Sequence, residues 1–366
     1  MRSGKKKIRV LIVEDSLVVR TALEYIIERH PRLAVAGSAT SAEQALAMLE
    51  RVAPDVISMD IRLPGMNGLE ATRRIMTDHP TPIVVISSAV EDEQLNISMN
   101  ALRAGALSVV EKPVGTTHED YERIANHICT QLYIMSEVRV VRQRFHTPAM
   151  AKAVSAPLGS SGAGLGPVPG RGAGAAFQML GLVASTGGPN ALVKVLGALP
   201  AGFPLPICVV QHIGDDFVGG FALWLGGLLR LPVSLAEDGE SPLPGHVYVA
   251  PAHHHLRVGA GRFHLGRDAQ VSTQRPSGTV LFSSMAASYG PRAIGVLLTG
   301  MGDDGAAGLL AMRQAGAFTI AEDASTAVVY GMPAVAVHSG AVMAELPLDA
   351  IGARLLQLVN LPARAI

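Results

Sequence analysis

The sequence predicts two α/β domains, each built on an open, mostly parallel, doubly wound sheet. Short apolar runs rich in β-branched residues alternate with segments of helical periodicity over residues 1–146, and the same alternation recurs over residues 177–366. Between the two regions, 18 of the 22 residues from 155 to 176 are Gly, Ala, Ser or Pro, a composition typical of a flexible linker. We therefore predict domains over residues 1–146 and 177–366, joined by a flexible linker over residues 147–176.

The first domain is expected to contain five β-strands, each followed by a helix. Helical segments, for example over residues 16–29 and 68–77, separate the apolar runs. This order favours a parallel sheet with helices on both faces. The predicted strands are residues 8–13, 33–39, 55–60, 82–89 and 108–113.

The second domain repeats this order with different sequences. A small antiparallel part is expected between the VYVAP and GRFHLG segments, over residues 247–266. The remaining strands are predicted to form a second open sheet. They are residues 178–185, 206–212, 246–251, 293–300 and 317–323.

Composition excludes several classes of protein. The 30 basic and 30 acidic side chains cancel, so no overall positive field draws the chain to nucleic acid. Cys129 and Cys208 lie far apart in apolar segments, which favours reduced core thiols over a disulfide framework. The apolar run over residues 8–13 is too short for a signal segment, and no window reaches the ~20 apolar residues of a membrane span. A cytoplasmic protein without direct membrane insertion is expected.

Acidic and basic side chains follow the predicted strands of the first domain. Glu14 and Asp15 follow the first strand, Asp60 ends the third, Ser87 the fourth, and Lys112 the fifth. Because ligands bind at the carboxyl edge of such sheets, these side chains are expected to converge. Three carboxylates would repel one another unless a hard cation such as Mg²⁺ sat among them, and Asp60 could then accept a phosphoryl group. Helix capping is the alternative role for each acid taken alone.

The second domain carries a serine on a predicted strand-to-helix turn. A strand leads to Ser185, the turn runs through Thr186, Gly187 and Gly188, and Pro189 opens a helix. A serine in this position is exposed at the sheet edge, near backbone N–H groups that can hold an oxyanion. A glycine-rich turn before a helix is also an anion cradle, so a phosphate site is the alternative.

A histidine and a carboxylate are predicted at the same edge. His212 ends the next apolar strand, where it can reach Ser185 as a general base, and Asp303 and Asp304 follow a later strand. Spacing does not choose between these two aspartates. Three further acids compete for the role, namely Asp238, Glu322 and Asp323. Residues 253–255 are consecutive histidines on an extended segment whose side chains alternate in direction, so a metal site is not predicted there.

The first domain resembles a response-regulator receiver. The motifs VEDS, SMDIRLPGMNGLEA, ISSA and EKP occur at that family's spacing. The resemblance implies a flavodoxin-like (βα)5 fold in which Asp60 is the phosphoacceptor and Glu14 and Asp15 bind Mg²⁺ together with it. It also implies that Ser87 is the switch hydroxyl and that Lys112 contacts the phosphoryl group.

The second domain resembles the chemotaxis protein-glutamate methylesterase (CheB) family. The matching segments are VASTGGPNAL, VVQHI, AEDGESPLPGHVYVAPAHHHLRV, RPSGTVLF, LLTGMGDDGAAG and VVYGMP. By this resemblance Ser185 is the nucleophile, His212 the general base and Asp304 the orienting acid. Thr186 lies beside the nucleophile, and the backbone of Met301 is a candidate oxyanion donor.

The two resemblances together imply a phosphorylation-activated hydrolase. It would remove methyl groups from glutamyl methyl esters of methyl-accepting chemoreceptors and deamidate receptor glutamines. A histidine kinase of the same pathway would be the phosphodonor, with Mg²⁺ in the receiver and no cofactor in the esterase. The alternative is a non-enzymatic response regulator whose second domain binds a nucleotide or a partner through the STGGP turn.

Overall fold

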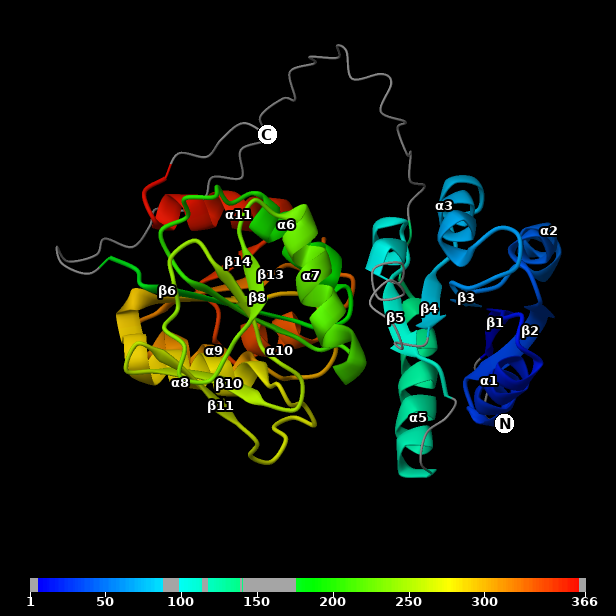
Figure 1. Ribbon diagram of the computed structural model, residues 1–366, viewed down its shortest axis with the longest axis horizontal. Coiled ribbons are helices and arrows are strands. Elements are labelled where there is room, and N and C mark those ends of the chain that lie inside the picture. Colours follow the sequence, from blue (N-terminus) through cyan, green and yellow to red (C-terminus); the bar gives the residue numbers. More distant parts are fainter. Residues whose placement is uncertain (1–5, 88–98, 114–117, 139, 141–175, 362–366) are drawn as a thin grey trace, which may run out of the picture.

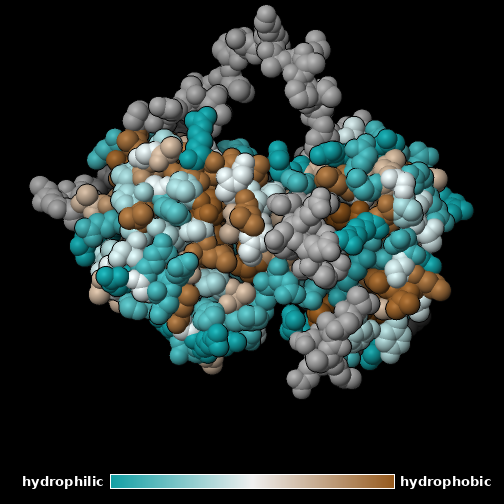
Figure 2. Space-filling view, in the orientation of Figure 1, coloured by the Kyte–Doolittle hydropathy of each residue, from teal (hydrophilic) through white to brown (hydrophobic). Residues whose placement is uncertain are grey.

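The computed structural model describes residues 6–87, 99–113, 118–138, 140 and 176–361 of the chain (Figure 1). Almost all of the predicted linker over residues 147–176 lies outside the described residues. The two predicted domains form two lobes (Figure 1). On the face seen in Figure 2, hydrophobic residues form separate patches among polar ones on both lobes. No helix in the described part is long and apolar enough to cross a membrane.

The first lobe contains the predicted parallel sheet. Its five strands within the described ranges run in the order β2-β1-β3-β4-β5, and every neighbouring pair is parallel. The strands are β1 (Ile8–Val13), β2 (Leu33–Ala39), β3 (Val56–Met59), β4 (Ile83–Ser87) and β5 (Ser108–Glu111). The helices within the described ranges include α1 (Leu17–Arg29), α2 (Ala42–Val52), α3 (Gly68–Asp78) and α5 (His118–Met135).

Helices cover both faces of this sheet because successive strand residues point to opposite sides. Val10 and Ile12 pack with α1 and α5, whereas Leu11 and Val13 pack with α2 and α3. Polar side chains fix where three of the helices begin. Ser16, Ser41 and Asn67 cap α1, α2 and α3 by accepting a hydrogen bond from a backbone N–H of the first turn.

The second lobe holds a larger parallel sheet. Within the described residues its seven strands run in the order β14-β13-β12-β6-β7-β9-β8. The strands are β6 (Met179–Ala184), β7 (Ile207–Gln211), β8 (Val233–Leu235), β9 (Val247–Val249), β12 (Ala293–Leu297), β13 (Phe318–Glu322) and β14 (Ala344–Leu346). The helices are α6 (Gly188–Gly197), α7 (Val218–Leu228), α8 (Gly278–Tyr289), α9 (Ala306–Gln314), α10 (Met332–His338) and α11 (Leu348–Leu358), with short 3-10 turns at Asp215–Phe217 and Gly290–Arg292.

Two apolar cores enclose this sheet. Leu180 and Leu182 of β6 face one core with α6, α7 and α11, and Met179 and Val183 face the other with α8, α9 and α10 (Figure 1). The predicted antiparallel part is the pair β10 (His255–Gly259) and β11 (Arg262–Gly266). The VYV segment before it is β9, which pairs in parallel with β7 and β8.

The two lobes contact each other through α5 and the adjoining residues of the first lobe. The side chain of Gln131 on α5 donates to the hydroxyl of Thr186 at 3.4 Å, and the amide of Asn190 on α6 donates to the carbonyl of Leu102 at 3.2 Å. In Figure 1, α5 and β5 lie on the side of the first lobe that faces the second lobe. The first lobe therefore lies against the edge of the second sheet from which Ser185 projects.

Candidate functional site

Ser185 lies on the predicted strand-to-helix turn. Strand β6 ends at Ala184 and helix α6 begins at Gly188, with Pro189 in its first turn. Gly187 makes the turn possible because its φ of +79° is in the left-handed region that favours glycine. On the β12 side, the backbone N–H of Ser185 donates to the carbonyl of Thr299 at 3.0 Å. The turn thus holds the serine at the carboxyl edge of the sheet.

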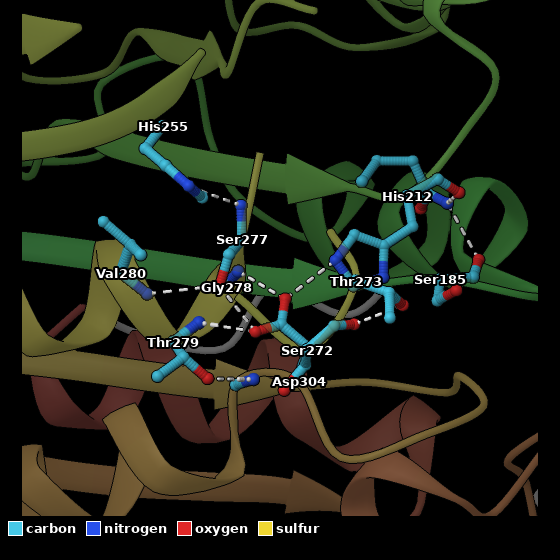
Figure 3. Close-up of polar contacts among 12 residues, drawn as sticks. Ser185, His212, His255, Ser272, Thr273, Ser277, Gly278, Thr279, Val280 and Asp304 are labelled. Carbon is cyan, nitrogen blue, oxygen red and sulfur yellow. Dashed lines mark hydrogen bonds and ion pairs between the residues drawn. The ribbon is translucent and has the colours of Figure 1, made fainter. Parts of the chain in front are cut away.

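His212 lies next to Ser185 because strands β6 and β7 are neighbours. Ala184 and Gln211 are paired in the parallel register, so the residues that follow them, Ser185 and His212, leave the sheet together (Figure 3). The backbone N–H of His212 donates to the carbonyl of Ala184 at 3.0 Å. In the described part of the chain, no hydrogen bond joins the Ser185 hydroxyl to the His212 ring. Hydroxyl-to-base contacts of this kind are often long in a site without substrate.

Asp304 is the carboxylate that meets the histidine. Its Oδ2 lies 2.9 Å from Nε2 of His212, and both side chains are buried. Three groups at the start of α8 also donate to this carboxylate, as Figure 3 shows: the Ser277 hydroxyl at 2.6 Å, the Gly278 N–H at 2.6 Å and the Thr279 N–H at 3.1 Å. Burial favours the neutral acid, but hydrogen bonds from His212, Ser277 and Thr279 outweigh it and lower the pKa of Asp304 to about 2. Asp304 is therefore a carboxylate at every physiological pH.

The hydrogen bond between His212 and Asp304 fixes the tautomer of the His212 ring. An ionised carboxylate only accepts hydrogen bonds, so Nε2 of His212 must carry the proton. In the neutral ring, Nδ1 is then the unprotonated nitrogen that can act as a base. A base of this kind, held by a buried acid beside a serine, is the arrangement that acyl transfer to a hydroxyl requires.

The other acidic candidates do not meet the histidine. Asp303 is exposed, and among the described residues no hydrogen bond or ion pair joins it to His212. Asp238 accepts a hydrogen bond from the backbone N–H of Leu265 in β11. The last two candidates have other partners: Asp323 caps a turn through Ser325 and Thr326, and Glu322 accepts from the backbone N–H of Thr299.

The cradle around Asp304 was not predicted from the sequence. Ser277, Gly278 and Thr279 precede Asp304 by about 26 residues and meet it only because α8 begins beside the β12 loop. A local signal was present, since Ser277 is the N-cap of α8, and a helix N-terminus favours a negative charge. His255 supports this cradle, with Nδ1 accepting from the N–H of Ser277 at 3.3 Å.

The three consecutive histidines have separate partners. His253 pairs with Asp215 at 3.2 Å, and His254 contacts Arg267 at 2.9 Å. The Nε2 of His255 lies 3.0 Å from the carbonyl of Ala269. The rings therefore do not converge on one point.

A cleft of about 790 Å³ opens above the Ser185 turn. Ser185, Thr186, His212, Met301 and Asp304 line it from the second lobe. Met301, whose backbone is the candidate oxyanion donor, is 50% exposed in the cleft wall, and Thr186 is buried under Gln131. Residues of β5 and α5 line the opposite side, including Val109, Ile124, His127 and Gln131. The cleft thus lies between the two lobes.

The acidic cluster of the first lobe forms as expected. Ligand oxygens of Glu14, Asp15 and Asp60 all lie within 4.8 Å of one another. The ammonium of Lys112 lies 2.9 Å from a carboxylate oxygen of Glu14 and 2.9 Å from Oδ2 of Asp60. Ser87, the last residue of β4, is buried at the same sheet edge. The sheet therefore brings all the predicted residues of this pocket to one edge.

The electrostatics of this pocket suit a cation. Burial and the charge of Asp60 raise the pKa of Glu14 to about 7, although Lys112 opposes the shift. Burial also raises the pKa of Asp60, again against the influence of Lys112. In the part of the chain that the structure describes, two buried acids and one exposed acid share the single ammonium of Lys112, so three carboxyl groups face one positive charge. Carboxylate oxygens in this number, with room for water at exposed Asp15, fit a hard divalent cation.

Comparison with known proteins gives two family matches along the chain. Residues 10–120 match the response regulator receiver domain, and residues 180–355 match the CheB methylesterase domain. The catalytic domain of the CheB methylesterase of Thermotoga maritima is 37% identical and covers 50% of this chain and 100% of that one, with a TM-score of 0.49.

Full-length relatives extend the similarity over nearly the whole chain. A protein-glutamate methylesterase/protein-glutamine glutaminase of Paramagnetospirillum magneticum is 54% identical over 354 residues, covering 97% of this chain and 98% of the relative. One from Myxococcus xanthus is 44% identical over 349 residues, covering 95% and 96%. The chain therefore belongs to the CheB family of protein-glutamate methylesterases/protein-glutamine glutaminases, with a receiver domain before the methylesterase domain.

Proposed function

We propose that the chain hydrolyses glutamyl methyl esters of methyl-accepting chemoreceptors with Ser185 as nucleophile, His212 as general base and Asp304 as orienting acid. The supporting observation is the Nε2 contact of His212 with Asp304 at 2.9 Å, because it leaves Nδ1 as the basic nitrogen beside the Ser185 turn. Receptor glutamines would be deamidated by the same groups, since an amide presents the same carbonyl carbon to the nucleophile.

The reaction proceeds in two acyl transfers. Nδ1 of His212 takes the hydroxyl proton of Ser185 as Oγ attacks the ester carbonyl carbon, and the Asp304 carboxylate stabilises the imidazolium. The tetrahedral intermediate collapses when His212 returns the proton to the departing methanol, or to ammonia from a glutamine. Water then attacks the acyl-serine with His212 again as base. The products are a glutamate side chain and the regenerated Ser185 hydroxyl.

We assign stabilisation of the oxyanion to the wall of the cleft. The backbone of Met301 lies in the loop before Asp304 and borders the same cleft as Ser185. Thr186, which follows the nucleophile, is the second candidate. Preorganised donors in such positions stabilise the charge that develops on the carbonyl oxygen.

The receiver supplies control by phosphorylation in this proposal. Asp60 would accept a phosphoryl group from a histidine kinase, and Glu14, Asp15 and Asp60 would hold Mg²⁺. The metal ion would neutralise charge on the phosphoryl oxygens. Lys112, already within 2.9 Å of Asp60, is placed to contact the same group, and Ser87 at the end of β4 would reorient toward it.

The unphosphorylated receiver would restrict access to the triad. Gln131 of α5 donates to Thr186, the residue after the nucleophile, and α5 and β5 line the cleft opposite Ser185. A large receptor segment would reach Ser185 only if this contact opened. The linker predicted over residues 147–176 would let the domains separate without detaching.

The test is methanol release from membranes that carry methylated receptors, with and without Mg²⁺ and a small phosphodonor. We expect stimulation by phosphodonor in the parent chain and none in Asp60→Asn, which keeps its basal activity because an amide cannot form the acyl phosphate. Labelling with a fluorophosphonate should be confined to Ser185. Nucleotide binding at the STGGP turn without any ester hydrolysis would support a non-enzymatic regulator instead.

A second arm tests occlusion. Residues 177–366 alone are expected to demethylate receptors about 5- to 150-fold faster than the unphosphorylated full chain, the usual range for coupling between two sites, and to ignore phosphodonor. A folded fragment that is no more active than the full chain would mean that the receiver activates the esterase directly or recruits the substrate.

A further inference from the structure

We propose that Gln211 is a positioning residue that sets the spacing between nucleophile and general base, a role that rests on the triad proposed above. Its side-chain amide donates to the backbone carbonyl of Ser185 at 2.8 Å and to the backbone carbonyl of His212 at 2.9 Å. One side chain therefore bridges the two residues whose side chains must exchange a proton.

The chemistry of the amide makes this bridge specific. A carboxamide nitrogen carries two hydrogens, and both are used here, one for each carbonyl. The reversed orientation would place the amide oxygen against two carbonyl oxygens, so the nitrogen must face them. Gln211 is only 4% exposed, so water is not a ready substitute for these donors.

The surrounding backbone leaves the amide little room to move. A Cβ placed on Gly188 would collide with Oε1 of Gln211, so the amide packs directly against the first residue of α6. The nitrogen of the same amide donates to the backbone carbonyls of Ser185 and His212. The side chain is thus held between the helix that follows the nucleophile and the strand end that carries the base.

Other contacts hold each catalytic residue separately. The N–H of Ser185 is fixed to Thr299 of the β12 side, and the N–H of His212 to Ala184 of β6. Gln211 differs because it joins the carbonyl of Ser185 to that of His212, across the two turns that leave the sheet. Loss of this bridge would let the turns shift relative to each other while both strands stay paired.

Gln211 is not a catalytic residue in this assignment. Its donors are occupied by backbone carbonyls, so it does not reach the Ser185 hydroxyl or the His212 ring. Its effect is expected in kcat, because a misplacement of reacting groups by about 1 Å can slow the chemical step about 100-fold. Gln211 also borders the cleft, but it is only 4% exposed, so substrate binding is expected to change little.

The experiment compares Gln211→Glu and Gln211→Met in the full chain, in demethylation of receptor membranes with Mg²⁺ and phosphodonor. Glutamate keeps the shape of the side chain but turns acceptor oxygens toward the two carbonyls, whereas methionine keeps the length and removes the donors without adding charge. We expect kcat to fall about 10- to 100-fold in both, with KM changed less than about twofold. Gln314→Glu, an exposed glutamine at the end of α9, is the charge-matched control and should keep the parent kcat.

The melting temperature of each variant and the rate of fluorophosphonate labelling are measured in parallel. A slower labelling rate in a folded variant supports the positioning role. An unchanged kcat, a change in KM alone, or failure of both variants to fold would overturn it, the last by making Gln211 a residue of stability only. Ser185→Ala is included because residual hydrolysis in that variant would refute the proposed nucleophile, a different failure from that of Gln211.

Discussion

The acidic pocket of the receiver and the Asp304 site of the esterase occupy equivalent places, the carboxyl edge of a parallel sheet, but their carboxyls differ in electrostatic state. Asp304 accepts hydrogen bonds from His212, Ser277, Gly278 and Thr279, and its pKa is lowered to about 2. Glu14 is buried beside Asp60 with one shared ammonium, and its pKa is raised to about 7.

This difference shows how the surroundings of a buried acid determine its use. Donors from the N-terminus of α8 keep Asp304 ionised, and in the proposed mechanism this fixed charge would orient His212 as the base. Among the described residues, Glu14 and Asp60 each accept fewer hydrogen bonds than Asp304 does, so an added cation or a proton would balance the charge of the receiver pocket. In the proposed function, the esterase site would therefore need no added ion, whereas the receiver pocket would respond to the cation or phosphoryl group that it binds.

The largest effects are expected at the complete site. Ser185→Ala and His212→Ala should each lower methanol release by about 1,000-fold or more, because nucleophile and base act as one unit. Ser185 is only partly buried, so Ser185→Ala should keep the melting temperature of the parent, whereas His212→Ala removes a hydrogen bond from buried Asp304 and should lower the melting temperature by a few degrees. Substantial hydrolysis by either variant, measured on receptor membranes with phosphodonor, would remove that residue from the mechanism.

The two adjacent aspartates offer a sharper comparison. Asp304→Asn should slow hydrolysis at least about 100-fold, since an amide can present N–H to Nε2 of His212 and stabilise the wrong tautomer. Asp303→Asn, at an exposed position in the same loop, should change the rate less than about twofold. The reverse pattern in parallel kinetics of the two variants would assign the orienting role to Asp303.

Asp304 also has a signature in acid unfolding. Its folded pKa of about 2 lies below its ordinary value of 3.8, so its contribution to stability is present above pH 4 and is lost as pH falls toward 2. The shift corresponds to about 2 kcal/mol of unfolding free energy. That contribution should be missing from Asp304→Asn when the two proteins are unfolded by denaturant at pH 6.

Some residues of these two sites could be predicted from the sequence and others could not, and the reason is physical. Residues that end a strand, such as Asp60, Lys112 and Ser185, were identified because parallel strands share one carboxyl edge. Ser277 and Thr279 were missed because they reach Asp304 only through the packing of α8 against the β12 loop. Gln211 was overlooked because its importance lies in where its amide points, which the VVQH motif does not reveal.

Prediction of the strands from the sequence had the same limit. The long apolar runs became central strands, whereas β8 and β14, with three residues each at the two edges of the larger sheet, were not predicted. Three residues carry too little alternation to be distinguished from a loop. Such edge strands are defined by pairing with β9 and β13, which is a property of the assembled sheet.

We expect pH to have a moderate effect on the affinity of the receiver pocket for Mg²⁺. Because a cation binds the ionised form of Glu14, whose pKa is about 7, Mg²⁺ must displace a proton at pH 6 but hardly at all at pH 8. The apparent affinity for Mg²⁺ should therefore weaken about tenfold between pH 8 and pH 6, measured by isothermal titration. Glu14→Gln should bind more weakly at both values and lose this pH dependence. A wild-type affinity that is constant over this range would show that Glu14 does not ligate the ion.

The smallest effect on activity is expected at Glu322, an acid that resembles Glu14 in its burial but lies in the esterase domain. It is 0% exposed, its Oε2 accepts from the backbone N–H of Thr299, and burial raises its pKa. A group whose folded pKa is raised stabilises the fold fully at acid pH, and this contribution is lost as pH rises through the folded pKa.

In Glu322→Gln the amide oxygen can accept the same hydrogen bond without burying a charge. We therefore expect methanol release within about twofold of the parent and a melting temperature that exceeds the parent's at pH 8 by more than it does at pH 5. Glu237→Gln, an exposed acid of the same domain, is the control and should show no such difference. A Glu322→Gln variant less stable than the parent at pH 8 would mean that the Glu322 carboxylate has a stabilising partner, so that this acid resembles Asp304 rather than Glu14.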